Sequence, residues 1–170
     1  MTATSDCPAF DAEKLRSIEE LDKRDAAFHE AGHAIVAIAL KSRWVRAWIW
    51  KNDTENPLEE NTWRGKCTSH NEDPESKAII GIAGAVAEAI VKGEWDDCWV
   101  FDFCEWDLSA SDAEMIEGWD VEHIAEKAHH ILMEKWHQVE CIASELIKED
   151  SLTDGMILDL IEAADAREEQ

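Results

Sequence analysis

The feature that most constrains the fold of this chain is an apolar segment, AAFHEAGHAIVAIALK at residues 26–41, which carries two histidines and a glutamate. Alanine and isoleucine flank these polar residues on most sides of a helix, a pattern that predicts a buried helix. Buried polar groups are costly unless each one has a partner. His29, Glu30 and His33 therefore either satisfy one another or share a bound group.

The pentapeptide HEAGH in this segment is an HExxH motif. Residues four apart lie on one face of a helix, so His29 and His33 can both reach one metal ion. Glu30 can then accept a proton from a metal-bound water without binding the metal, because the metal lowers the pKa of that water to about 7. Gly32 leaves room for another element to approach closely. The motif predicts a zinc site with His29 and His33 as ligands and Glu30 as the general base.

The third ligand is not part of this motif. A catalytic zinc ion usually takes three protein ligands and a water, and the position six residues beyond His33 is alanine. The plausible carboxylates are Glu88, Asp107 and Asp112. The remaining histidines are expected in solvated or supporting roles: His70, His123, His129, His130 and His137.

Periodicity predicts a mainly helical chain with a small sheet. Asp73, Pro74 and Gly93 are typical start and stop signals for a helix over 74–92. In that helix Gly81, Gly84 and Glu88 fall on one face, which favours close approach of a neighbouring helix. The other expected helices cover 11–22, about 23–41, a segment capped by Ser111 with Glu114, 121–149, and a stretch after Thr153; strands are expected at 43–51 and 62–70.

Composition limits the possible partners. The chain has 39 acidic and 16 basic residues and a formal net charge of -23. Such a charge disfavours nucleic acid and anionic membranes, although an acidic decoy that imitates DNA has the same composition. The N-terminus resembles no signal peptide, the longest apolar stretch is too short for a bilayer, and five cysteines without a CxxC pair suit a reduced compartment. These features predict a cytoplasmic protein.

Three segments together resemble the FtsH-type zinc metallopeptidases, the proteolytic domain of membrane-anchored AAA+ proteases. FHEAGHAIVAIAL is similar to the zinc helix of that family, and IIGIAGAVAEAIVKG is similar to its Gly-rich helix. ILMEKWHQVECIASELIKEDSLTDGMI is similar to its C-terminal helices. The resemblance covers residues 24 to 165 in order.

The resemblance implies a mainly α fold with a small β-sheet, in which a zincin-like HExxH helix packs against the Gly/Ala-rich helix and a C-terminal helical bundle follows. Residues 1–10 are expected to be a flexible tail and residues 11–170 a single metallopeptidase domain. It also implies that His29 and His33 bind zinc, that Glu30 is the base, and that an aspartate at the start of a later helix is the third ligand.

The sequence also departs from the family. There is no phosphate-binding loop of the GxxxxGK[ST] kind and no transmembrane segment. The family's Gly-Ala-Ser-Asn-Asp segment is replaced by LSASDAEMI at 108–116, and the acidic, aromatic segment 94–108 before it is long. Asp112 matches the family segment most closely and follows Ser111, a good helix cap, so it is the preferred third ligand over Asp107 and Glu88.

Two functions are consistent with these features. The first is a zinc-dependent endopeptidase that hydrolyses peptides or unfolded polypeptides, with no ATP, nucleic acid or membrane as a partner. The second is a non-catalytic acidic binding protein on the same scaffold, comparable to a DNA mimic. An intact HExxH motif favours the peptidase, because a decoy needs neither metal ligands nor a base.

Overall fold

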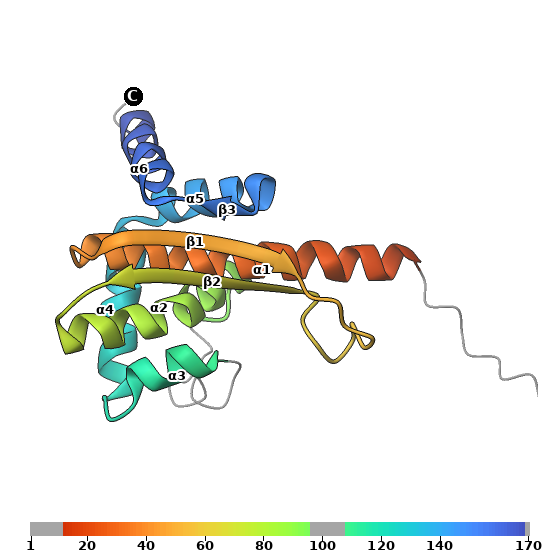
Figure 1. The fold of residues 1–170 in the computed structure, drawn as a ribbon, viewed down its shortest axis with the longest axis horizontal. Coiled ribbons are helices and arrows are strands. Elements are labelled where there is room, and N and C mark those ends of the chain that lie inside the picture. Colours follow the sequence, from red (N-terminus) through yellow and green to blue (C-terminus); the bar gives the residue numbers. More distant parts are fainter. Residues whose placement is uncertain (1–11, 96–107, 169–170) are drawn as a thin grey trace, which may run out of the picture.

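The computed structural model describes residues 12–95 and 108–168. This part of the chain is mainly helical with a small antiparallel sheet, as the sequence predicts (Figure 1). The helices are α1 (Ala12–Ala39), α2 (Pro74–Lys92), α3 (Ala110–Ile116), α4 (Val121–Glu134), α5 (Trp136–Glu149) and α6 (Asp154–Glu168). The strands are β1 (Arg43–Lys51), β2 (Trp63–His70) and β3 (Ser151–Leu152). The expected tail at 1–10 lies outside the described residues.

Helix α1 is the central element of the fold. The prediction of two separate helices, 11–22 and 23–41, is wrong, because α1 is continuous from Ala12 to Ala39. Asp22 lies inside this continuous helix, at the expected boundary between the two ranges. Its carboxylate accepts hydrogen bonds from the backbone N–H and the hydroxyl of Thr62, at 2.7 and 2.8 Å. This contact ties the middle of the long helix to the start of β2.

The sheet has the order β2-β1-β3, and both of its pairings are antiparallel. The two strands expected from the sequence are confirmed at 43–51 and 63–70. The short β3 is too brief for any alternation to reveal it, but it pairs with β1 through Ala47 and Leu152. Val45, Ala47 and Ile49 are buried on the inner face of β1, and α1 contacts both β1 and β2.

Helix α2 begins and ends where the sequence predicts. The Asp73 carboxylate accepts from the backbone N–H of Ser76 at 2.8 Å, and Gly93 ends the helix in the left-handed conformation. Small residues let α2 approach α1 closely, since a Cβ atom at Gly32 would lie 2.8 Å from the Ala83 carbonyl oxygen. The prediction that Gly32 makes room for another element is therefore confirmed.

The single helix expected over 121–149 is instead two helices. The backbone leaves the helical conformation at Lys135, with φ -122° and ψ 21°. Each half packs on a different neighbour, α4 against α2 and α5 against α1. Both helices have a buried apolar face, so the spacing of apolar residues continues through Lys135. The spacing alone therefore does not reveal the break. Trp136 begins α5 and stacks on Phe28 of α1, with 5.8 Å between ring centroids.

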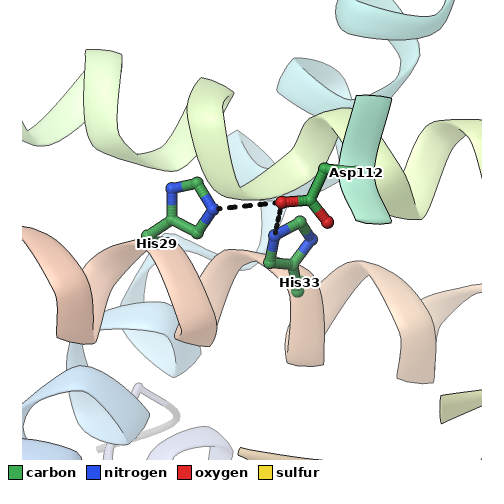
Figure 2. Close-up of side chains that lie close together, drawn as sticks. All are labelled: His29, His33 and Asp112. Atoms are coloured by element: carbon green, nitrogen blue, oxygen red, sulfur yellow. Dashed lines mark ion pairs between the residues drawn. The ribbon is translucent and has the colours of Figure 1, made fainter. Parts of the chain in front are cut away.

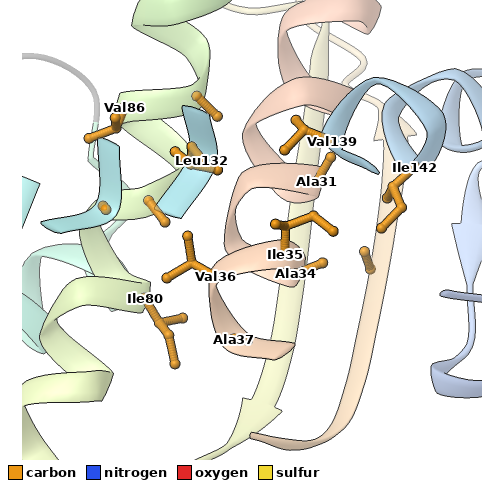
Figure 3. Packing of buried hydrophobic residues seen from close by; sticks show 14 of the residues in the cluster. Ala31, Ala34, Ile35, Val36, Ala37, Ile80, Val86, Leu132, Val139 and Ile142 are labelled. Carbon is orange, nitrogen blue, oxygen red and sulfur yellow. The ribbon is translucent and has the colours of Figure 1, made fainter. Parts of the chain in front are cut away.

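The core surrounds α1 (Figure 3). Ile35 and Val36 point toward opposite sides of the helix, the first toward Ile142 of α5 and the second toward Leu132 of α4 and Ile80 of α2. Burying a side chain of this size contributes about 1.5–3 kcal/mol. This packing fixes α1, and with it both histidines, between the sheet and α2. Within the described ranges, no helix is both long enough and apolar enough to cross a bilayer.

Candidate metal centre

Three side chains that the sequence proposes as ligands come together in the structure (Figure 2). His29 and His33 lie one turn apart on α1, and Asp112 comes from α3. The Oδ2 atom of Asp112 lies 3.8 Å from Nε2 of His29 and 3.7 Å from Nε2 of His33. One potential ligand atom from each residue lies within 4.8 Å of the other two, so this group could hold a metal ion.

The other ring nitrogen of each histidine is already occupied. Nδ1–H of His33 donates to the carbonyl oxygen of Ile80 at 2.6 Å, and Nδ1–H of His29 donates to Glu88 Oε2 at 3.1 Å. A carbonyl and a carboxylate can only accept, so Nδ1 carries the proton in both rings. In the neutral imidazoles, Nε2 then has the free lone pair that a metal ligand needs.

Helix α2 shapes the back of the group. A Cβ atom at Gly84 would overlap Nε2 of both His29 and His33. Gly81, one turn earlier, faces α3 instead, where a Cβ would meet Met115 and the Asp112 carbonyl. The glycine stripe expected to allow close approach is confirmed, with one glycine against the histidines and the other against the helix of Asp112.

Asp112 is held by the first turn of α3. The Ser109 hydroxyl accepts from the Asp112 backbone N–H at 3.2 Å and donates to Asp112 Oδ2 at 2.6 Å. Ser109 is therefore the cap, and the prediction that Ser111 caps this helix is wrong. Two serines stand three residues before an acidic residue, Ser109 before Asp112 and Ser111 before Glu114. Sequence spacing alone cannot choose between them.

Glu30 is buried, with 4% of its surface exposed. Its Oε2 atom has no hydrogen-bond partner among the described residues. Gly65 of β2 lies directly against it, because a Cβ atom there would come 2.5 Å from Oε1. Burial raises the pKa of Glu30, while the charges of His29 and His33 oppose that rise. A buried carboxylate oxygen without a hydrogen bond is costly, so Oε2 of Glu30 is an atom that a group outside the described residues could engage.

The electrostatics of the metal-free group favour ion pairs. Burial lowers the pKa of His29, but the nearby carboxylates of Asp112 and Glu88 outweigh burial and raise it to about 10. Burial raises the pKa of Asp112, yet the two imidazoles more than reverse that effect and hold it well below its usual range. For Glu88, His29 and Lys92 overcome burial and lower the pKa to about 2. At neutral pH His29 is therefore protonated and lies between the ionised carboxylates of Asp112 and Glu88.

The other sequence candidates lie elsewhere. Glu88 contacts Nδ1 of His29, on the side of the ring away from Asp112, and is not one of the three converging groups. Asp107 and most of segment 94–108 lie outside the described residues. Three further histidines make exposed ion pairs on the surface: His123 with Glu75, His130 with Glu134 and His137 with Asp165.

Three supporting positions were not found from the sequence: the Ile80 carbonyl, Ser109 and Gly65. A backbone carbonyl leaves no trace in the sequence. Gly65 does leave one, because an isolated glycine in a strand indicates close approach of another group.

The donor set suits a metal of intermediate hardness. Two imidazoles and one carboxylate are the ligands of many catalytic zinc sites, and Glu30, whose Oε2 atom makes no hydrogen bond to a described residue, lies beside them. The chain matches no protein-family model, and a search of curated proteins finds no significant match.

Proposed function

We propose that this protein is a zinc-dependent endopeptidase of the zincin-like, FtsH type, which hydrolyses peptide bonds in peptides or unfolded polypeptides. The observation that carries the proposal is the pairing of two features. Two histidines and an aspartate converge in a group that could hold a metal ion, and beside them lies a buried glutamate whose Oε2 atom has no hydrogen-bond partner among the described residues. A structural metal site needs the first feature only. The second feature is what a hydrolase needs.

His29, His33 and Asp112 would hold the ion. A bound zinc ion supplies Lewis acidity, which polarises a carbonyl and lowers the pKa of a bound water. Glu88 and the Ile80 carbonyl orient the two imidazoles and keep their protons on Nδ1. Ser109 orients the Asp112 carboxylate. These contacts keep the ligand atoms in place before any substrate arrives.

Glu30 would act as the general base. Burial raises the pKa of Glu30 and so moves it toward neutral pH. A general base works best when its pKa lies near the working pH. Glu30 takes a proton from the attacking water and returns it to the nitrogen of the leaving amine. Gly65 keeps β2 close to this carboxylate, so the reaction would take place beside the sheet. A substrate segment could then bind as an added strand on β2.

The charge of -23 is the one observation that favours the alternative, a non-catalytic acidic binding protein comparable to a DNA mimic. The buried Glu30 argues against it. A charge mimic has no use for an unpartnered carboxylate inside the fold, where it costs stability and is hidden from a partner.

The test is hydrolysis of casein by purified protein loaded with zinc. Activity should disappear with a chelator and return when zinc is added. Glu30→Gln should lose nearly all activity and keep its metal, whereas Glu114→Gln, an exposed change of the same chemistry on α3, should behave as wild type. Cleavage that survives both the chelator and Glu30→Gln would refute the proposal.

A further inference from the structure

The two long strands differ sharply in charge from the rest of the chain. β1 and β2 contain Arg43, Arg46, Lys51, Arg64 and Lys66, five of the 16 basic residues, and none of the 39 acidic ones. The protein as a whole has a net charge of -23, so these strands form a positive region on an otherwise negative surface. Its charges act on a ligand only within about 8 Å, the Debye length at physiological salt.

The register places part of this charge on one face of the sheet. Side chains of directly paired residues point to the same face. Arg46 pairs with Thr68, Trp48 with Lys66, and Trp50 with Arg64. Their neighbours Val45, Ala47 and Ile49 are buried toward α1. The outer face therefore presents Arg46, Arg64 and Lys66 together with two tryptophans, a set we call the cationic face.

The cations of this face are exposed, and no side chain in the described part of the chain pairs with them. Arg46, Arg64 and Lys66 are exposed, and none of them makes an ion pair or side-chain hydrogen bond with another described residue. Lys51 of the same strand pairs with Glu19. Trp50 is 42% exposed. In a chain with many more acids than bases, unpaired arginines are available for an external anion.

The strand β2, which carries Arg64 and Lys66, lies at the edge of the sheet. Among the described residues it pairs with β1 only, so its other edge has no partner strand there. The Ile49 N–H donates to the Asp150 carbonyl on the β3 side. Backbone direction alternates along a strand, so even-numbered residues of β1 bond to β2. Their partners Arg64 and Lys66 use their backbone groups inward, and Gly65 and Cys67 direct theirs to the free edge.

A cavity and the candidate metal centre lie near this edge of β2. Gly65 faces Glu30 on the inner side. A cavity of about 340 Å³ lies at the end of β2, lined by Ser69 and His70 of the strand, Lys77 and Ile80 of α2, and Met115 of α3. Ile80 is also the residue whose carbonyl holds His33. A chain lying along β2 would have His29 and His33 on its inner side and the cationic face on its outer side.

We propose that the free edge of β2 and the cationic face form one docking surface for an extended polypeptide segment with acidic side chains at alternate positions. Backbone groups of the segment pair with Gly65 and Cys67, and its outward side chains lie beside Arg64 and Lys66. Opposite charges on neighbouring strands stabilise pairing, and like charges oppose it. This inference rests on the proposed function for the fate of the bound segment, since its inward side chains would face the metal centre.

A polypeptide suits this surface better than a nucleic acid. Free N–H and C=O groups along a strand are satisfied by another backbone strand, and a nucleotide chain has no matching repeat. The cationic face is also only a few residues wide, whereas the surrounding charge repels a continuous polyanion. A segment with acidic side chains on one side can place them against the cationic face, while its other side carries no charge.

The ligand test uses labelled peptides and fluorescence anisotropy with Glu30→Gln protein, in which no cleavage occurs under the proposal. The peptides are an alternating Glu/Val sequence, the same composition arranged in two blocks, and an alternating Lys/Val sequence. The alternating acidic peptide should bind at least about tenfold more tightly than either control, and more weakly as salt rises. Methylating alternate backbone amides should abolish binding in one register and spare it in the other.

The protein test reverses charge. Arg64→Glu with Lys66→Glu should weaken the acidic peptide by about tenfold and improve the lysine peptide. Lys148→Glu with Arg167→Glu, at exposed positions on α5 and α6, makes the same change in net charge and should leave both affinities unchanged. All these positions are exposed, so folding is expected to be preserved, and circular dichroism verifies it.

Several outcomes would overturn the inference: equal binding of the three peptides, indifference to amide methylation, equal effects of the two double variants, or tighter binding of a single-stranded oligonucleotide. Because binding is read without turnover, failure of this inference and failure of the proposed peptidase activity are distinguishable. An active enzyme that ignores peptide charge refutes the docking surface alone. An inactive protein that binds the alternating acidic peptide refutes the activity alone.

Discussion

At the scale of single residues, the candidate centre depends on what surrounds the ligands as much as on the ligands. His29 and His33 follow from the HExxH spacing, because a helix leaves little freedom in where residues four apart can lie. The sequence signal for Asp112 is weaker, because it is only an aspartate near the start of a helix. The glycine stripe of α2 indicates that some element approaches closely, but the sequence does not say that Gly84 meets the histidines. The roles of the Ile80 carbonyl and Ser109 likewise depend on tertiary packing.

Gly84→Ala should damage the site without touching a ligand. The new Cβ atom would overlap Nε2 of both histidines, and metal–ligand distances tolerate only about 0.2 Å. We expect zinc affinity to fall by at least about tenfold, although alanine normally stabilises a helix by about 1 kcal/mol relative to glycine. Titration with a competing chelator measures this affinity.

The matched control is Gly155→Ala, where an added Cβ would meet no described residue within 4 Å apart from its chain neighbours and its own helix backbone. It should leave zinc affinity unchanged. Equal zinc affinity in the Gly84 variant and wild type would mean that the histidines do not bind through Nε2.

The raised pKa of His29 predicts that zinc affinity depends on pH. The pKa of His29 is raised to about 10, above about 6.5 for an unfolded chain. Its stabilisation of the metal-free fold is therefore complete below about pH 6.5 and is lost as pH rises toward 10. Zinc displaces the same proton, so zinc affinity should rise over this window.

Calorimetry in buffers of different ionisation enthalpy would count the protons released when zinc binds at pH 7.5. About one proton from His29 is expected. Binding of zinc with no proton release would show that the ion binds away from His29.

At the scale of elements, the sequence predicts most helices and strands but not how they are joined. α2 follows from Asp73, Pro74 and Gly93, and β1 and β2 follow from alternation. The continuity of α1 and the break at Lys135 do not follow, because both depend on contacts with distant segments, Asp22 with Thr62 and α4 with α2. Local patterns report which face of an element is buried, and tertiary contacts decide where the element ends.

Helix α3 has only seven residues, so its cap should matter for the site. Ser109→Ala removes the hydroxyl that accepts from the Asp112 N–H and donates to its carboxylate. Loss of a cap costs about 1 kcal/mol, and the loss of orientation should lower zinc affinity about tenfold. Urea unfolding and zinc titration measure the two effects.

Ser111→Ala is the control for this element, because Ser111 is the cap that the sequence alone would have chosen. It should change zinc affinity far less than Ser109→Ala. A larger loss of zinc affinity in Ser111→Ala than in Ser109→Ala would show that Ser111 is the cap after all.

At the scale of the whole molecule, the proposed centre links helices that are distant in sequence. α1 and α3 supply the ligands and α2 supplies the contacts behind them. A metal that binds only the folded chain stabilises it by about 2.7 kcal/mol at 100 times its Kd. Zinc should therefore raise the melting temperature by about 5–10 °C for a domain of this size.

Differential scanning fluorimetry with and without a chelator measures this link between metal and stability. The Asp112→Ala variant should show little zinc-dependent shift. A full shift in that variant would place the stabilising metal elsewhere in the molecule.

The most direct test of the central claim is the zinc content of purified protein, measured by mass spectrometry for wild type and four variants. We predict about one zinc per chain in wild type and in Glu30→Gln, and almost none in His29→Ala, His33→Ala and Asp112→Ala. Full zinc content in Asp112→Ala would contradict the ligand set, and no zinc in wild-type protein after loading would contradict the centre itself.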